Sequence, residues 1–172
     1  EKEGFDVSLQ TVPGKLSDHY NPANEVVALS ADNATNSSIA NIAVVAHEFG
    51  HVQQKRDGMA LFKLRTAMVP AVQFGSGAGY IIMIIGFLLS ASGLINVGLI
   101  LFSTTAVFAL ITLPIELNAS NRAMKLIQKH NLISPHKMKG ARTVLNAAAL
   151  TYVAALIEQL GTLLYFFIRS RE

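Results

Sequence analysis

The sequence predicts a mainly α-helical integral membrane protein, in which three membrane helices are joined to a small α+β segment. Hydrophobic residues make up 51% of the chain and charged residues only 15%, whereas soluble domains carry about 25% charged residues. Residues 66–115 contain no Asp, Glu, Lys, Arg or His. A second long apolar run covers residues 143–168, with Glu158 as its only charged residue.

Four segments are expected along the chain. Residues 1–66 form the α+β segment, residues 67–115 a transmembrane hairpin, residues 116–142 a cytoplasmic helix, and residues 143–172 the third transmembrane helix. The sequence begins at Glu1 rather than at a methionine, which predicts a fragment or a processed chain. It contains no cysteine, so no disulfide framework is expected.

The α+β segment contains two predicted strands and one long helix. Alternation of apolar and polar residues predicts a strand over residues 5–9, and an apolar run predicts another over residues 25–30. The helix should run from about Ser38 to Arg56, with the residues at 36–38 as candidate caps, and stop at Asp57-Gly58. This segment is too small for an independent core.

The uncharged stretch is long enough for two spans, because a spanning helix needs about 20 apolar residues. We place the spans near residues 72–89 and 94–113, with the small residues 90–93 as the turn. Gly75 and Gly79 form a G-x-x-x-G pair that favours close helix packing.

The third apolar helix has a clear start. Ser134 and Pro135 supply an N-cap and a first-turn proline. The helix then enters the membrane near Val144. Glu158 would lie near mid-membrane, where a carboxylate is costly. Two interpretations of Glu158 remain equal alternatives, a functional site and a carboxyl that serves helix assembly.

The predicted helix of the α+β segment carries the pattern H-E-x-x-H at residues 47–51. His47 and His51, four residues apart, project from one helix face and can hold one Zn²⁺ ion. Glu48 can then act as general base toward water. These features predict a peptidase segment that is zincin-like, that is, built around a zinc-binding helix.

A catalytic zinc needs a third protein ligand. Glu116 is the acidic residue that directly follows the second span. Because a hairpin returns to the side that it left, we expect Glu116 to lie near His47 and His51. The alternative is a glutamate that stabilises a helix N-terminus after Pro114.

Four segments of the chain resemble the bacterial neutral zinc metallopeptidases of the YugP type. They cover residues 12–22, 46–51, 113–123 and 147–155. The resemblance implies a membrane zinc peptidase with His47, His51 and Glu116 as ligands.

The layout is also similar, more distantly, to the HtpX-type membrane peptidases, whose second motif reads E-x-x-A-D. Here the aspartate is replaced by Ser120. In that group the acid orients a ligand histidine. Ser120 can accept a hydrogen bond from an imidazole but supplies no charge, and Asn118 is expected to share the role.

In the mechanism expected for such a site, Glu48 accepts a proton from the water and passes it to the leaving amine. A further donor should stabilise the oxyanion. The sequence offers four candidates and does not choose among them: His19, Tyr20, Arg122 and Tyr152.

The charge pattern predicts the orientation of the hairpin. Its turn carries no charge, and basic residues flank it on both sides: Lys63, Arg65, Arg122, Lys125 and Lys129. The positive-inside rule therefore places both flanks, and the site, on the cytoplasmic face of the cell membrane in a multi-pass protein. Arg169 and Arg171, which would lie outside, conflict with the same rule.

The predicted function is hydrolysis of peptide bonds in membrane-associated or unfolded proteins. The expected partners are a polypeptide substrate, for which residues 26–30 could serve as an edge strand, and the lipid bilayer. Further membrane proteins or an oligomer are candidates. Nucleic acid is not expected, because the net charge of +3 comes with no basic face interleaved with aromatics. The alternative is a catalytically weak or inactive membrane scaffold or adaptor with a structural zinc site.

Overall fold

The computed structural model describes residues 3–171. These residues divide into two compact units. The sheet unit comprises residues 3–59 and 115–149, and the apolar unit comprises residues 60–114 and 150–171.

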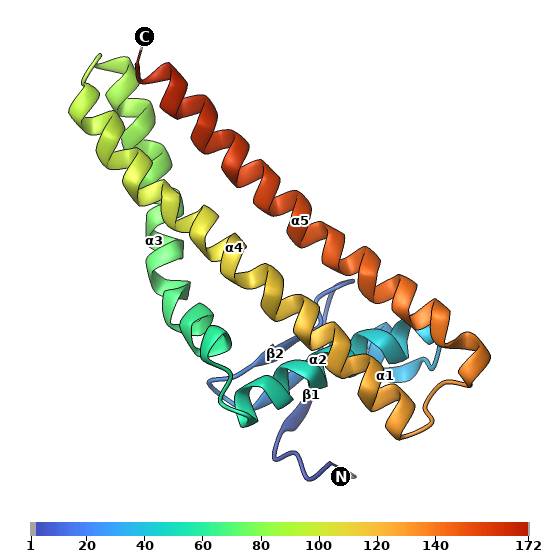
Figure 1. The fold of residues 1–172 in the computed structure, drawn as a ribbon. Coiled ribbons are helices and arrows are strands. Elements are labelled where there is room, and N and C mark those ends of the chain that lie inside the picture. The colour runs from blue at the N-terminus through green and yellow to red at the C-terminus, as the bar shows by residue number, and fades with distance from the viewer. Residues whose placement is uncertain (1–2, 172) are drawn as a thin grey trace. The chain divides into compact units, whose positions relative to one another are not determined.

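The sheet unit contains three short strands, β1 (Ser8–Val12), β2 (His19–Asn21) and β3 (Val26–Ser30). Their order is β1-β3-β2, with β1 parallel and β2 antiparallel to β3 (Figure 1). The strand predicted over residues 25–30 is confirmed as β3, whereas the first strand lies three residues later than predicted. The short β2 was not predicted.

The position of β3 overturns one prediction. Because β3 pairs with a strand on each side, its backbone groups are already engaged within the sheet. The expectation that residues 26–30 offer an edge strand to a substrate is therefore wrong. The outer strands of the sheet are β1 and β2.

Two helices follow β3, the short α1 (Ala31–Thr35) and the long α2 (Ile39–Arg56). The Ser38 side chain accepts a hydrogen bond of 3.1 Å from the backbone N–H of Asn41, which confirms the predicted N-cap. At the other end the chain turns at Gly58 with a φ of +67°, a left-handed conformation that glycine adopts without strain.

The core of the sheet unit lies where α2 packs against the ends of two long helices, α4 (Ser92–Lys129) and α5 (Met138–Arg169). A set of buried apolar side chains fills it. Its members are Ala43, Ala46, Ala123, Met124, Ile127, Ile133, Ala141 and Leu145. The alanines allow the helices to approach closely, which positions the site described below.

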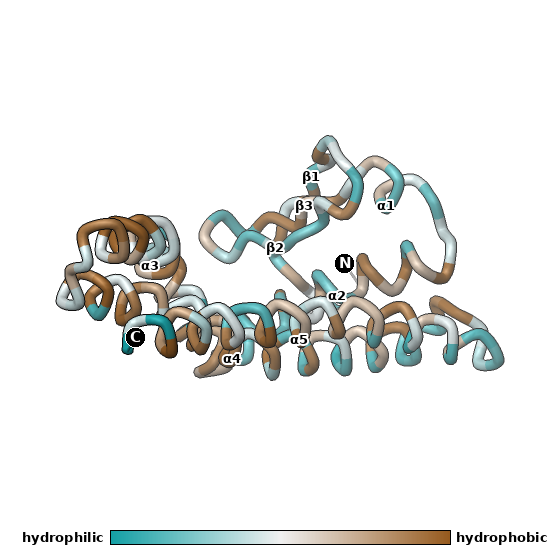
Figure 2. The backbone as a smooth tube through the Cα atoms, turned by 90° about the horizontal axis from the view of Figure 1, so that it is seen from above, coloured by the Kyte–Doolittle hydropathy of each residue, from teal (hydrophilic) through white to brown (hydrophobic). Residues whose placement is uncertain are grey.

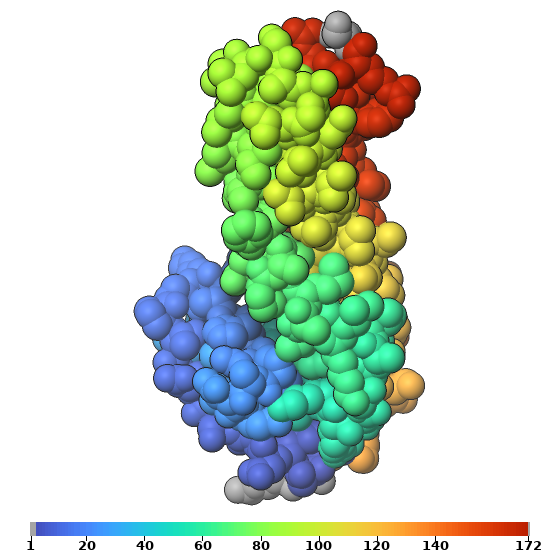
Figure 3. All heavy atoms as spheres, turned by 90° about the vertical axis from the view of Figure 1, so that its left-hand side faces the viewer, coloured from blue at the N-terminus to red at the C-terminus, as the bar shows by residue number. Residues whose placement is uncertain are grey.

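The apolar unit contains α3 (Ala60–Leu88) and parts of α4 and α5. All three helices are long and apolar enough to cross a membrane, as predicted. Figures 1 and 3 show α3 and α4 side by side. Figure 2 shows long hydrophobic stretches along α3.

The hairpin in the apolar unit is closely packed. A Cβ added at Gly79 would lie 2.7 Å from the backbone nitrogen of Phe102, and one added at Gly75 would lie 2.8 Å from the Leu101 carbonyl oxygen. Close packing at the G-x-x-x-G pair is therefore confirmed. The turn covers residues 89–91 instead of the predicted 90–93, since α3 ends at Leu88 and α4 begins at Ser92.

The third apolar helix, α5, follows a short 3₁₀ turn, η1 (Pro135–Lys137). Ser134 is its N-cap and Pro135 occupies the first turn, as predicted. Glu158 is exposed on α5, and the neighbouring Gln159 contacts Thr105 Oγ1 at 2.9 Å.

Candidate metal centre

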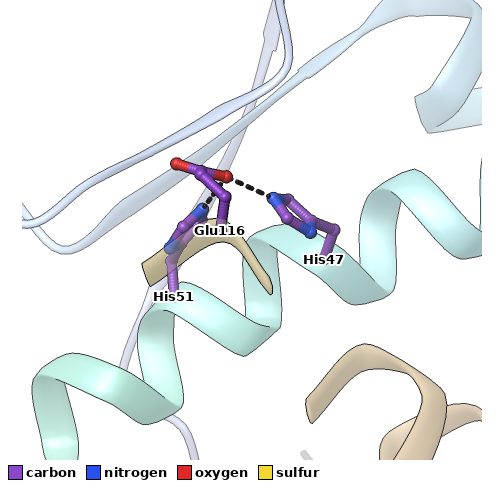
Figure 4. Close-up of side chains that lie close together, drawn as sticks. All are labelled: His47, His51 and Glu116. Atoms are coloured by element: carbon purple, nitrogen blue, oxygen red, sulfur yellow. Dashed lines mark hydrogen bonds and ion pairs between the residues drawn. The ribbon is translucent and has the colours of Figure 1, made fainter. Parts of the chain in front are cut away.

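Helix α2 places His47 and His51 on one face, as the spacing of four residues requires. Their ring centroids lie 4.8 Å apart, and the rings are nearly perpendicular. His51 is buried, and His47 is only slightly more exposed. The Nε2 atoms of both rings point to the same carboxylate (Figure 4).

That carboxylate belongs to Glu116 on α4. Its Oε2 atom lies 3.0 Å from His47 Nε2 and 3.5 Å from His51 Nε2. Glu116 is 1% exposed. Helix α4 runs through Pro114 without a break, so Glu116 does not lie at a helix N-terminus. The alternative role as a helix-stabilising glutamate is therefore excluded.

The three side chains have the donor set that zinc prefers. One ligand atom from each of His47, His51 and Glu116 lies within 4.8 Å of the others. Two imidazole nitrogens and a carboxylate oxygen are typical of catalytic zinc sites, which leave the fourth position open. The lone-pair-bearing atoms of these three side chains lie close together in a poorly hydrated place. A divalent cation bound to all of them would offset the cost of burying them.

Glu48 lies next to His47 and is 7% exposed. Burial raises the pKa of its carboxyl group, against the opposing effect of the histidines and of a hydrogen bond from the Tyr20 backbone. A carboxyl of this kind is suited to accept and return a proton. Burial by itself lowers the pKa of His51, but the Glu116 carboxylate outweighs it and raises that pKa. The Glu116 carboxylate thus places a negative charge beside both histidines, which favours cation binding.

A family model described as "Putative neutral zinc metallopeptidase" matches residues 1–171. The chain belongs to this family. It is also similar to the "Putative membrane protease YugP" of Bacillus subtilis (strain 168), with 42% identity over 171 residues that cover 98% of this chain and 76% of the relative. No solved structure matches the chain. The resemblance stated from the sequence is thus confirmed.

Ser120, one turn after Glu116, lies beside His47. Its Oγ atom is 3.2 Å from His47 Nδ1, the ring nitrogen that faces away from Glu116. The hydroxyl therefore occupies the place predicted for an orienting group. It can donate or accept a hydrogen bond.

His51 has a different partner, Gln54, which was not predicted from the sequence. Gln54 is fully buried, and its Oε1 atom lies 2.9 Å from His51 Nδ1. Their spacing could have indicated this contact, since residues three apart on a helix share a face. Asn118 contacts Gln54 rather than a histidine, with its Oδ1 atom 3.0 Å from Gln54 Nε2.

The oxyanion candidates within the sheet unit are not directed at the three ligands. The exposed His19 has Nδ1 2.8 Å from the Ser17 carbonyl oxygen. The Tyr20 hydroxyl donates to Glu25, and burial together with Glu25 raises its pKa. Arg122 pairs with Asp57 at 2.5 Å and with Asn118 at 2.8 Å.

The fourth candidate, Tyr152, lies on α5 in the apolar unit and is half-buried. Of the two candidates on β2, His19 and Tyr20, Tyr20 contacts the Glu48 carboxyl through a backbone hydrogen bond. Its side chain is engaged elsewhere.

Proposed function

We propose that the protein is a membrane-embedded zinc metalloendopeptidase that hydrolyses peptide bonds in membrane-associated or unfolded polypeptides. The observation that carries this proposal is the convergence of His47, His51 and Glu116, with the buried Glu48 beside the first ligand. The match to a zinc metallopeptidase family over residues 1–171 supports it.

His47, His51 and Glu116 would hold the zinc ion, in keeping with their donor atoms. When bound, zinc lowers the pKa of water to about 7 and polarises the scissile carbonyl. Glu48 removes a proton from the attacking water and delivers it to the leaving amine nitrogen. Its burial keeps competing solvent away from this proton.

The substrate class follows from the burial of the site. Because His51, Glu48 and Glu116 are all buried, a polypeptide must be extended to bring a peptide bond to them. A segment could add to the sheet along β2, an outer strand whose Tyr20 backbone bonds Glu48. Compact soluble proteins would be poor substrates.

The location is proposed to be the cytoplasmic face of the cell membrane. Three helices are long and apolar enough to span. The uncharged hairpin turn and the basic residues on both flanks support this orientation. Further membrane proteins or a second copy remain candidate partners.

The decisive experiment compares the purified full chain with Glu48→Gln, using an unfolded protein as substrate and measuring zinc content in parallel. We expect proteolysis to fall at least about 100-fold while zinc remains bound. Asp6→Asn, which makes the same chemical change at an exposed position, should cleave normally. Full activity of Glu48→Gln, or loss of its zinc, would refute the assigned role.

One observation favours a second candidate, a weak or inactive adaptor with structural zinc. His47 contacts the uncharged Ser120 hydroxyl, which supports a ligand less strongly than a carboxylate does. The same experiment separates the two functions. An adaptor would retain zinc and show no cleavage even with Glu48 intact.

A further inference from the structure

We propose that Arg122, Asn118 and Gln54 form a directed chain of hydrogen bonds that fixes the tautomer of His51. The chain keeps the proton on Nδ1 and leaves the Nε2 lone pair facing Glu116. Gln54 is thus a positioning residue. The inference rests on the proposed zinc site, and it concerns side chains of the sheet unit alone.

The direction of the chain is set at Arg122, because a guanidinium group donates hydrogen bonds and accepts none. Arg122 Nε donates to Asn118 Oδ1 at 2.8 Å. The amide of Asn118 is therefore oriented with its oxygen toward this point. The same oxygen also accepts from Gln54 Nε2 at 3.0 Å.

A second contact orients Gln54 independently. Gln54 Nε2 lies 2.8 Å from the backbone carbonyl oxygen of Ile115, which can only accept. The NH₂ end of the Gln54 amide must face α4, and its oxygen must face His51. Gln54 is 0% exposed, so water cannot substitute for either partner.

His51 Nδ1 lies 2.9 Å from this Gln54 oxygen. Because an amide oxygen accepts only, Nδ1 must carry a proton. In the neutral ring Nε2 is then unprotonated and carries a free lone pair, and it lies 3.5 Å from Glu116 Oε2. This is the protonation state that a zinc ligand requires.

The two histidines differ in this respect. His47 Nδ1 faces the Ser120 hydroxyl, which can donate as well as accept, so its tautomer is not fixed in this way. We infer that His51 is the pre-organised ligand and His47 the adaptable one. Gln54 also ties α2 to α4 at Ile115, the residue before the third ligand.

The test uses the metal-free full chain and two variants of adjacent glutamines. Gln54→Met keeps the side-chain length and removes both hydrogen-bonding roles. Gln53→Met makes the same change at a half-buried position that has no side-chain hydrogen bond among residues 3–171. The readouts are the ¹⁵N shifts of the His51 ring, identified by their loss in His51→Gln, and the zinc dissociation constant by chelator competition.

The wild type and Gln53→Met should show a His51 ring protonated at Nδ1. Gln54→Met should show a mixture of tautomers and bind zinc about 10- to 100-fold more weakly. Gln54→Glu should retain the Nδ1–H form, because a carboxylate still accepts from His51, although its contacts with Ile115 and Asn118 are lost.

A neutral wild-type ring with its proton on Nε2 instead of Nδ1 would overturn the inference without any variant, even where Gln54→Met does not fold. An unchanged tautomer and unchanged zinc affinity in Gln54→Met would overturn it as well. These readouts do not involve proteolysis. A chain that binds zinc with the expected tautomer but cleaves nothing would refute the proposed enzyme and leave this inference standing.

Discussion

Gly50 of α2 lies directly against the backbone of Ala119 in α4. A Cβ atom added at Gly50 would be only 2.5 Å from the Ala119 carbonyl oxygen. This contact falls between the two histidines on one helix and between Glu116 and Ser120 on the other. Because Gly50 has no side chain, the two helices can approach closely enough for Glu116 to reach His47 and His51.

Gly50→Ala should separate α2 from α4 at the site. Because the obstacle is backbone rather than a flexible side chain, we expect zinc affinity to fall at least tenfold and stability to fall by about 1–3 kcal/mol. Gly140→Ala is the matched control, since its Cβ would meet only Ile39 side-chain atoms at 3.5 Å. Chelator competition and denaturant unfolding measure both effects, and equal behaviour of the two variants would contradict the close-contact explanation.

Glu116→Ala should remove one of the three proposed ligands. We expect zinc occupancy and proteolysis to fall together, unlike the result for Glu48→Gln, because the two glutamates have different roles. Metal analysis after dialysis against a weak chelator gives the occupancy. Normal occupancy and activity would place the third ligand elsewhere, with His19 the next residue to substitute.

Ser120→Asp should strengthen the support of His47. A carboxylate at this position would accept from Nδ1 and raise the basicity of the ring, so we expect tighter zinc binding. Ser120→Ala removes the 3.2 Å contact and should weaken zinc binding by about tenfold. Zinc dissociation constants for the three proteins should follow the order Asp, Ser, Ala from tightest to weakest, and any other order would argue against a role for this contact.

Glu25 should make the stability of the sheet unit depend on pH. The Lys55 ammonium and then the Tyr20 hydroxyl lower the pKa of its carboxyl below the usual 4.5. A lowered pKa in the folded state stabilises the protein above pH 4.5 and stops doing so as pH falls through the folded value. Glu25→Gln should therefore be less stable than wild type at pH 7 by under about 1 kcal/mol.

The difference between wild type and Glu25→Gln should shrink steadily below pH 4.5. Chemical unfolding at several pH values measures it. A constant difference from pH 7 to pH 3 would show that the ion pair with Lys55 is not its origin.

The proposed topology can be tested with single cysteines, because the native chain has none. Ser92→Cys, at the exposed start of α4, and His136→Cys, in the exposed η1 turn, should react with an impermeant thiol reagent from opposite sides of the membrane. The reagent should reach position 136 only from the cytoplasm. Labelling of both positions from one side would disprove the hairpin.

The helices and the histidine pair could be predicted from the sequence because both depend on local spacing, whereas the place of Glu116 followed from the hairpin. Two histidines four apart share a helix face, and an uncharged stretch of two spans returns the chain to bring Glu116 beside them. The central place of β3 could not be predicted, because strand order depends on pairings among distant residues. β2 has three residues, too few to show an alternating pattern. Gln54 was overlooked because a glutamine next to another glutamine looks like ordinary helix surface.

One side of helix α2 has two roles, since it carries His47, His51 and Gln54 and also packs into the core through Ala43 and Ala46. Unfolding the core therefore also dismantles the ligands. A metal ion present at 100 times its dissociation constant should add about 2.7 kcal/mol to the unfolding free energy. The rise in melting temperature, measured by calorimetry, can therefore rank zinc against other divalent ions by affinity. This measurement needs no substrate, and it works equally well in a variant whose Glu48 has been replaced.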